Sequence, residues 1–393
     1  MKNMNRKGGA AIVAVLIVII MVAVGSALMV VTGRKTIQSS KTVEAPMPDG
    51  YSDKETTPEE TVKEEEPEVP ISDPVPAATV SVLPQIANTY ETITLKDATF
   101  NSAVLLDCES NEILAGFKYD KKIYPASLTK LLTLLVAAEN IDDMKATYTF
   151  TDEDIDPLID ENASRAGFEA GEAVTMEDLM YAAITVSGAD GTLGLSKAVA
   201  GSEEAFVDLM NKKVTDLGLS DTHFVNASGL HNDQHYSTAQ DIAAVTKACM
   251  DNDVCRKVLS AESYTTSKTK QHEEGIELDS IFHSRFGGYW IDIDGDGYGD
   301  ADIVGGKTGF TDEAMYTLST VVDVDGHEYI CVVTKSEGDL ISVEDTIMVF
   351  ENYLPGAVGT VSDDEGDTED TEETDDHTDG TEEVPVINDE TEE

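Results

Sequence analysis

Basic residues are scarce in this chain. It has 26 lysines and arginines against 77 aspartates and glutamates, which gives a formal net charge of -51 over 393 residues. The phosphates of a nucleic acid would repel a chain with this balance, so we expect no nucleic-acid partner. The acidic residues are concentrated near the two ends of the sequence more than in its middle. We therefore expect the folded domain in the middle of the sequence.

Cysteine is also rare. The four cysteines are Cys108, Cys249, Cys255 and Cys331, and no two of them form a Cys-x-x-Cys motif. An exported chain could oxidise two of them to a disulfide, but the favoured interpretation is buried free thiols, because free cysteine is among the residues most often buried. The sequence also contains no internal repeat.

A long uncharged, apolar run stands near the N-terminus. After three basic residues it extends from Ala10 to Val31. About 20 apolar residues are needed to cross a bilayer, whereas the apolar region of a signal peptide spans roughly 7–15. We therefore expect residues 1–35 to form an uncleaved single-pass membrane anchor. Cleavage at the small residues 23–27 is the alternative, and in either case the rest of the chain lies outside the cytoplasm.

Two acidic segments flank the part of the sequence that can fold. Residues 36–94 are rich in proline, glutamate, serine and threonine, and residues 357–393 contain no lysine or arginine. Such segments bury too little apolar surface to fold, so we expect an extended linker and a solvated, disordered tail. The remaining residues, 95–356, are expected to form one folded domain.

Strand and helix signals both occur within that domain. Strands are expected at 101–107, 113–117, 302–310, 316–323 and 328–334, the last two joined by an Asp-Gly hairpin turn. Helical spacing is found at 127–138, 175–185, 193–199, 203–217, after Thr238 and at 343–353. Strands at both ends with helices between them predict an α+β fold, in which an antiparallel sheet is flanked by helices and joined to a helical subdomain.

The stretch Tyr124-Pro125-Ala126-Ser127-Leu128-Thr129-Lys130 opens the first of these helices. Ser127 lies at the helix start, and Lys130 lies on the same face one turn later. A serine needs a base within hydrogen-bond reach to act as a nucleophile, and a lysine in an apolar pocket can have its pKa lowered enough to be that base. A helix cap followed by a surface lysine has the same pattern, so this motif by itself does not distinguish a catalytic serine from a structural one.

Two further motifs follow it in order, Ser187-Gly188-Ala189 and Lys307-Thr308-Gly309. Such a set is known from penicillin-binding proteins and class A β-lactamases. Together with the stretches 222–226, 229–230, 235–238 and 306–314, it makes residues 98–354 resemble the D-alanyl-D-alanine carboxypeptidases, the serine-type low-molecular-weight penicillin-binding proteins. The resemblance implies a β-lactamase/transpeptidase-like fold and hydrolysis of the terminal D-alanine of cell-wall stem peptides.

The resemblance also implies roles for the catalytic residues. Ser127 attacks the carbonyl of the penultimate D-alanine while Lys130 takes its proton. Ser187 passes that proton to the leaving D-alanine amine, and water then releases the acyl-enzyme. β-Lactam antibiotics are expected as acylating inhibitors, and neither a cofactor nor a metal is expected.

Four residues near the third motif are expected to bind the substrate. By the same resemblance, Lys307 supplies positive charge for the terminal carboxylate and Thr308 adds a hydroxyl contact. Gly309 lets its strand approach the substrate closely. The backbone N–H groups of Phe310 and Ser127 form the oxyanion hole.

The second motif departs from the family pattern, because Ala189 stands where the family has asparagine. The asparagine amide would contact the lysine and the substrate. This motivates an alternative function, a catalytically weak peptidoglycan-binding homologue. A β-lactamase is a further alternative, but it needs a carboxylate to activate the deacylating water. The sequence alone assigns that role to none of Glu161, Glu169 and Glu172.

Two other features suggest metal ligands. His231 and His235 are four residues apart, but Asn232 replaces the glutamate of a zinc-binding His-Glu-x-x-His motif, so a loop role is favoured. The segment Asp292–Asp300 copies the first nine positions of a calcium-binding loop, yet Ile303 stands where the twelfth should supply a glutamate. Either a weak calcium site or an acidic turn fits this segment.

Overall fold

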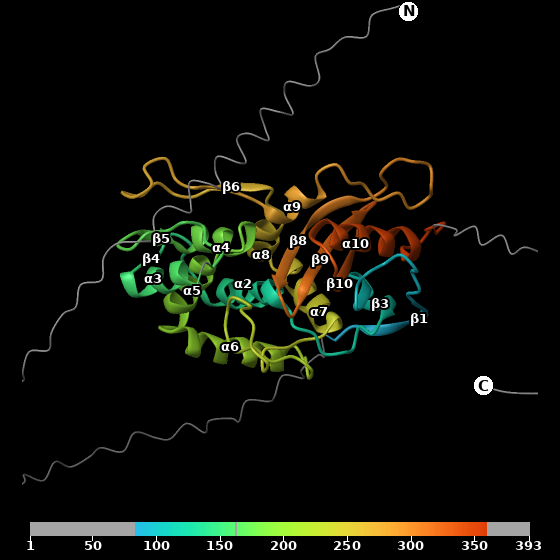
Figure 1. Cartoon of the computed structure of the whole chain (residues 1–393), viewed down its shortest axis with the longest axis horizontal. Helices are drawn as coiled ribbons and strands as arrows, with labels where there is room; N and C mark the ends of the chain where they lie inside the picture. The colour runs from blue at the N-terminus through green and yellow to red at the C-terminus, as the bar shows by residue number, and fades with distance from the viewer. Residues whose placement is uncertain (1–82, 162, 360–393) are drawn as a thin grey trace, which may run out of the picture. The chain divides into compact units, whose positions relative to one another are not determined.

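A six-stranded sheet forms the centre of the structure, a computed structural model that describes residues 83–161 and 163–359 (Figure 1). The strand order is β1-β3-β2-β10-β9-β8. The strands are β1 (Gln85–Thr92), β2 (Ser102–Asp107), β3 (Glu112–Phe117), β8 (Asp302–Thr311), β9 (Met315–Val324) and β10 (His327–Ser336). Because β2 pairs with β10, the two ends of the domain meet in the middle of the sheet.

The sheet is antiparallel from β3 to β8, as the sequence predicts, but β1 lies parallel to β3 at the opposite edge. β1 falls within residues 36–94, where the sequence predicts a linker. It is an edge strand in which Ala87 alone is buried, so its composition does not distinguish it from a spacer. The folded domain therefore extends at least to Gln85 rather than beginning at residue 95.

Alternate residues of the central strands face two different cores. In β10, Ile330 and Val332 face the core shared with α7 (Ala239–Met250) and the helical part of the molecule. Cys331 and Val333 face the other core, under α9 (Ile281–Phe286) and α10 (Asp339–Tyr353). Since both faces of these strands are covered, the strands are nearly continuous apolar runs, which explains why the sequence signals them clearly.

Helix α2 (Thr129–Asn140) is the centre of the helical part, which lies beside the sheet (Figure 1). It packs against neighbours on several sides, and nine of its 12 residues, from Thr129 to Ala137, are buried. Its leucine- and alanine-rich sequence follows from this position, because a helix covered all round has no solvated face. The helices around it are α4 (Met176–Thr185), α5 (Ala189–Ala200), α6 (Glu203–Asp216), α7 and α8 (Asp253–Leu259), and α3 (Asp152–Asp160) packs on α5.

Two predicted helices begin earlier than their apolar spacing indicates. α5 begins at Ala189 rather than at residue 193, and α10 begins at Asp339 rather than at 343. Both start just after a glycine N-cap. The first turn of α5 holds polar or small residues, and the apolar residues in the first turn of α10, Leu340 and Ile341, are exposed and lie off its buried face. The sequence also missed α3, α8, α9 and two short ribbons, β4–β5 (Thr147–Thr149, Ala173–Thr175) and β6–β7 (Ser263–Thr265, Glu277–Asp279).

The four cysteines are free thiols, as the sequence favoured, and all but the half-buried Cys108 are buried. Among the helices of the described residues, none combines the length and the hydropathy that crossing a bilayer requires. The predicted anchor at 1–35, residues 36–82 of the predicted linker and residues 360–393 of the predicted tail lie outside the described residues, so those expectations stay predictions.

Candidate active site

Ser127 lies in a single 3-10 turn, Ala126–Leu128, that leads directly into α2. The preceding residue, Ala126, has a φ of 47°, in a region that residues other than glycine rarely adopt. Strain of this kind persists only where the surrounding structure enforces it, and it is concentrated at functional sites.

Two glycines pack closely against this turn. A Cβ atom at Gly229 would lie 1.9 Å from the carbonyl oxygen of Ala126, and one at Gly309 would lie 3.1 Å from the backbone nitrogen of Ser127. Gly309 belongs to β8 and Gly229 to the loop 222–237. The turn that carries Ser127 is therefore held between the edge of the sheet and this loop. The sequence predicted a close approach of Gly309 to the substrate, which stays a prediction, and it assigned no role to Gly229.

Lys130 is the neighbour of the Ser127 hydroxyl. Its Nζ lies 3.0 Å from Ser127 Oγ and donates a second hydrogen bond, at 2.5 Å, to the carbonyl oxygen of Ser228. The side chain is buried, and this burial lowers the pKa of Lys130 to about 7, against the opposing effect of Asp190. A lysine with such a pKa is partly neutral near pH 7, and a neutral amine can accept the serine proton.

Ser187 and Lys307 form a second serine–lysine pair. Ser187 follows α4 with a φ of 56°, and Lys307 Nζ donates to its Oγ at 3.0 Å and to the Thr308 carbonyl oxygen at 2.8 Å. Both side chains are buried. Burial is the main cause that places the pKa of Lys307 well below its usual value, and repulsion from Lys130 adds to it. The helical part and the sheet are joined at this pair.

The structure thus brings together the residues that the three sequence motifs name. Ser127 and Lys130 come from the start of α2, Ser187 from the α4–α5 connection, and Lys307 from β8. Thr308 is buried beside Lys307, whereas the Phe310 ring is 49% exposed and packs on Tyr316 with ring centroids 4.6 Å apart. The proposed roles of Ser127 and Phe310 N–H groups in an oxyanion hole stay predictions.

Ala189 opens α5 where the family has asparagine. It is buried, and its N–H donates to the Ser164 carbonyl oxygen at 2.7 Å. The next residue, Asp190, does not replace the missing amide, because its buried carboxylate accepts hydrogen bonds from the backbone N–H groups of Ala166, Gly167 and Phe168. The carboxylate is therefore committed to holding that loop against α5.

Glu172 also has a structural role. Its Oε1 accepts from Thr269 Oγ1 at 2.7 Å and lies 2.9 Å from His272 Nδ1, while its Oε2 accepts from the Glu169 N–H at 2.9 Å. These bonds tie the buried carboxylate to the segment between β6 and β7. They account for Glu172 without a role in activating water.

The two histidines with zinc-like spacing have different surroundings. His235 is buried, its Nε2 lies 2.7 Å from Thr129 Oγ1, and its Nδ1 accepts from the Val225 N–H at 3.2 Å. Burial lowers the pKa of His235 to about 4, so the ring is neutral near pH 7 and ties the loop to α2. His231 packs instead against the Tyr124 ring. Their contacts agree with the predicted loop role.

The acidic segment ahead of β8 gathers three carboxylates. One oxygen each from Asp292, Asp294 and Asp300 lies within 4.8 Å of the others, and within the described ranges this is the one group of potential metal ligands that does so. Asp292 Oδ1 also accepts from the Gly295 N–H at 2.7 Å, as a turn-forming aspartate does. Ile303, at the twelfth loop position, lies in β8.

On this α+β framework lie two serine–lysine pairs, formed by the residues of the three motifs that resemble those of penicillin-binding proteins. The model of the peptidase S11 family, D-alanyl-D-alanine carboxypeptidase, matches residues 89–338. The chain belongs to this family.

Relatives and solved structures agree with this assignment. The chain is 28% identical over 219 residues to the D-alanyl-D-alanine carboxypeptidase DacF of Bacillus subtilis, covering 56% of this chain and 52% of the relative. It is 30% identical over 247 residues to DacC of Escherichia coli, covering 61% and 57%. The crystal structure of the Streptomyces K15 DD-transpeptidase matches with a TM-score of 0.56 and 25% identity, covering 66% of this chain and 98% of that one. The chain spans about half the length of these two curated relatives.

The contact at Gly229 predicts that Gly229→Ala slows acylation of Ser127. The new Cβ would collide with the Ala126 carbonyl oxygen and shift the turn that carries Ser127, at a position whose φ of 86° already disfavours alanine. We expect acylation by a penicillin to fall at least tenfold, or about 1.4 kcal/mol in the barrier. Gly201→Ala is the matched control, because its φ is 82° and a Cβ there meets no atom within 4 Å. Equal acylation rates in the two variants would contradict this role of Gly229.

The lowered pKa of Lys130 predicts how acylation depends on pH. The base must be neutral, so the acylation rate should fall about tenfold for each pH unit below the pKa of about 7 and level off above it. The measurement is the rate of penicillin labelling from about pH 5 to 9. Lys130→Arg should lose acylation at every pH, because a guanidinium stays protonated. A rate that does not change across this range would argue against Lys130 as the base.

Proposed function

We propose that the protein is a serine-type D-Ala-D-Ala carboxypeptidase, which hydrolyses the terminal D-alanine of cell-wall peptides through an acyl-enzyme on Ser127. The observation that carries this proposal is the 3.0 Å contact between Ser127 Oγ and a buried Lys130. Beside it, Lys307 of the edge strand β8 forms a second pair with Ser187 of the α4–α5 connection. Membership of the S11 family supports the same reaction.

The two serine–lysine pairs divide the steps of the reaction between them. Neutral Lys130 accepts the Ser127 proton as Oγ bonds to the carbonyl carbon of the penultimate D-alanine. The N–H groups of Ser127 and Phe310 stabilise the oxyanion that forms. The proton passes through Ser187 to the amine of the terminal D-alanine, and the C–N bond breaks. Water then attacks the ester carbon, which releases the shortened peptide and restores the Ser127 hydroxyl.

Lys307 recognises the terminal carboxylate of the peptide in this proposal. In the site without substrate, burial and the nearby Lys130 both lower the pKa of Lys307, so the protonated form of Lys307 is disfavoured. A bound carboxylate favours the protonated form of Lys307 and raises that pKa again. The terminal carboxylate and the Lys307 ammonium then neutralise each other in the site.

The proposed setting is the outer face of the cell membrane. Support comes from the uncharged, apolar run Ala10–Val31, from the long acidic linker that follows it and from the expected peptide substrate. The domain would reach the cell wall from a single-pass anchor, or as a secreted protein if the N-terminal segment is cleaved. β-Lactam antibiotics would acylate Ser127 as substrate mimics.

A catalytically weak peptidoglycan-binding homologue is the second candidate. The observation that favours it is Ala189, which cannot make the two contacts of the family's asparagine. Against it stand the intact contacts of Ser127, Lys130, Ser187 and Lys307. A site that had lost its activity would not need to keep both serine–lysine pairs assembled.

Ser127→Ala tests the proposed nucleophile. Without the hydroxyl no acyl-enzyme can form, so labelling by a fluorescent penicillin and release of D-alanine from a D-Ala-D-Ala peptide should both be lost. The thermal unfolding temperature should stay close to that of the unchanged protein, because the substitution removes one half-buried oxygen. Ser220→Ala, at an exposed serine, is the control that should label normally. Persistent labelling of the Ser127 variant would show that another residue is the nucleophile.

Ala189→Asn decides between an adapted site and a weakened one. We expect no gain in acylation, because Ala189 is buried and both serine–lysine pairs form without an amide at this position. If a missing amide limits the reaction, its hydrogen bonds are worth roughly 1–3 kcal/mol and the rate should rise tenfold or more. The measurement compares acylation by one penicillin and by one D-Ala-D-Ala peptide. A large gain with both substrates would favour the weak homologue.

A further inference from the structure

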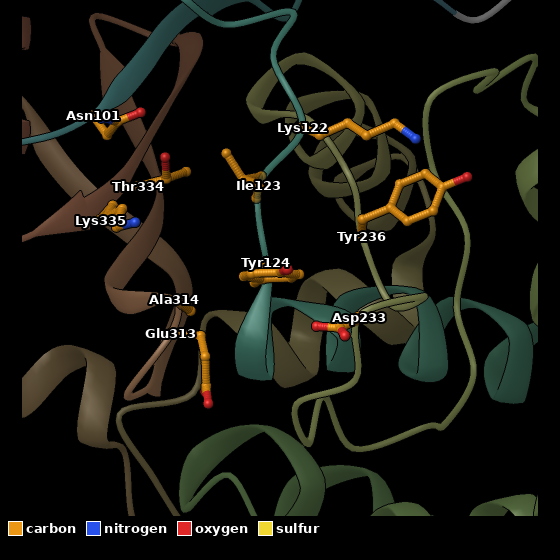
Figure 2. Close-up of a pocket in the computed structure, with 10 residues that line it drawn as sticks. All are labelled: Asn101, Lys122, Ile123, Tyr124, Asp233, Tyr236, Glu313, Ala314, Thr334 and Lys335. Atoms are coloured by element: carbon orange, nitrogen blue, oxygen red, sulfur yellow. The ribbon is translucent and has the colours of Figure 1, made fainter.

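A pocket of about 310 Å³ lies beside the residues that precede Ser127 (Figure 2). It is formed by the segment before α2, the loop 222–237, the β8–β9 turn and the ends of β2 and β10. The residues that line it are Asn101, Lys122, Ile123, Tyr124, Asp233, Tyr236, Glu313, Ala314, Thr334 and Lys335. Figure 2 shows the Asp233 and Glu313 side chains on either side of Tyr124, with Lys122 extended toward Tyr236.

The chain places this pocket next to the proposed active site. Tyr124 is three residues before Ser127, so their Cα atoms are at most roughly 11 Å apart, about the length of three extended peptide residues. On the sheet, Glu313 follows Phe310 by three residues at the end of β8. A peptide with its terminal carboxylate at Lys307 and its reacting carbonyl at Phe310 runs along β8 toward Glu313. The pocket therefore lies on the N-terminal side of the scissile bond.

The charged groups of the pocket differ in whether they have partners. His231 lies between the two carboxylates, with its Nε2 3.6 Å from Asp233 Oδ1 and its Nδ1 3.7 Å from Glu313 Oε2. Lys122 Nζ lies over the Tyr236 ring, 3.7 Å from the centroid. Throughout residues 83–161 and 163–359, no carboxylate oxygen lies within 4.0 Å of the ammonium of Lys122 or Lys335. The two carboxylates thus have an imidazole between them, at distances beyond hydrogen bonding, whereas neither ammonium group has a carboxylate beside it within the described residues.

We propose that this pocket binds a carboxylate-bearing residue of the substrate peptide, two or three residues before the D-alanine that acylates Ser127. The inference rests on the proposed function and extends it to a second part of the substrate. A chain with a net charge of -51 repels acidic peptides over most of its surface, so local positive charge is needed to hold one there. Lys122 and Lys335 supply that charge, and the rings of Tyr124 and Tyr236 form the walls.

A set of matched peptides tests this proposal. Three N-acetylated peptides end in D-Ala-D-Ala and differ only at the chosen upstream residue, which is Glu, Gln or Lys. The measured quantity is kcat/KM for release of D-alanine. We expect the Glu peptide to exceed the Gln peptide roughly threefold to tenfold at low salt, with the Lys peptide lowest. The preference should shrink when salt is raised to about 0.5 M, because exposed charges are then screened.

Variants of Lys122 and Lys335 test whether these two lysines cause the preference for the Glu peptide over the Gln peptide. Lys335→Gln and Lys122→Gln should each reduce the Glu-to-Gln ratio toward one. Lys335 provides the cleaner test, because Lys122 also contacts the Tyr236 ring. Lys121→Gln is the matched control: Lys121 is exposed, pairs with Asp120 at 3.2 Å and does not line the pocket, so its variant should keep the ratio of the unchanged protein.

The outcomes separate this inference from the function on which it rests. Release of D-alanine from all three peptides at equal rates, or a preference for the Lys peptide, would overturn the carboxylate pocket and leave the carboxypeptidase standing. An unchanged ratio in both lysine variants would also overturn it. Absence of D-alanine release from every peptide, together with no penicillin label on Ser127, would instead reject the proposed function.

Discussion

The burial of two lysine ammonium groups in one site is the constraint on which the rest of the structure depends. Removing an ammonium group from water is costly unless hydrogen bonds replace its hydration. Lys130 donates hydrogen bonds to the Ser127 hydroxyl and the Ser228 carbonyl oxygen. Lys307 donates to the Ser187 hydroxyl and the Thr308 carbonyl oxygen. These partners are incomplete replacements for water, so the pKa of each lysine is lowered. That lowering is also what the proposed role of Lys130 as a base requires.

Each of these hydrogen bonds joins segments that are distant in sequence. The Lys130–Ser228 bond ties α2 to the loop 222–237, and the Lys307–Ser187 bond ties β8 to the α4–α5 connection. The loop is secured again by His235, which contacts both Thr129 and the Val225 N–H. The positive φ angles at Ala126 and Ser187 are the local cost of this assembly. The strained turns therefore coincide with the two serines that carry the proposed chemistry.

The proposed active site and the pocket beside it differ in charge from the rest of the chain. The sequence is strongly acidic, yet the proposed active site and the neighbouring pocket contain four lysines, Lys122, Lys130, Lys307 and Lys335. Two are buried among hydroxyl and carbonyl groups, and two are exposed without a carboxylate partner within the described part of the chain. In the two proposals above, Lys307 binds a carboxylate at the end of the substrate, and Lys122 and Lys335 bind one further along it.

The sequence by itself determined most of the fold and named the residues of the proposed active site. The motifs at Ser127, Ser187 and Lys307 name residues whose chemistry is local, and strands buried on both faces have an unmistakable apolar pattern. The sequence did not reveal β1, because an edge strand with one buried side chain resembles a linker. It also assigned no function to Gly229 or the pocket beside Tyr124, and it did not identify Thr129 as the partner of His235. These features depend on contacts between segments about 100 residues apart, such as Thr129 with His235. Only the tertiary structure decides such contacts, because no local pattern encodes which distant backbone a glycine or a histidine will meet.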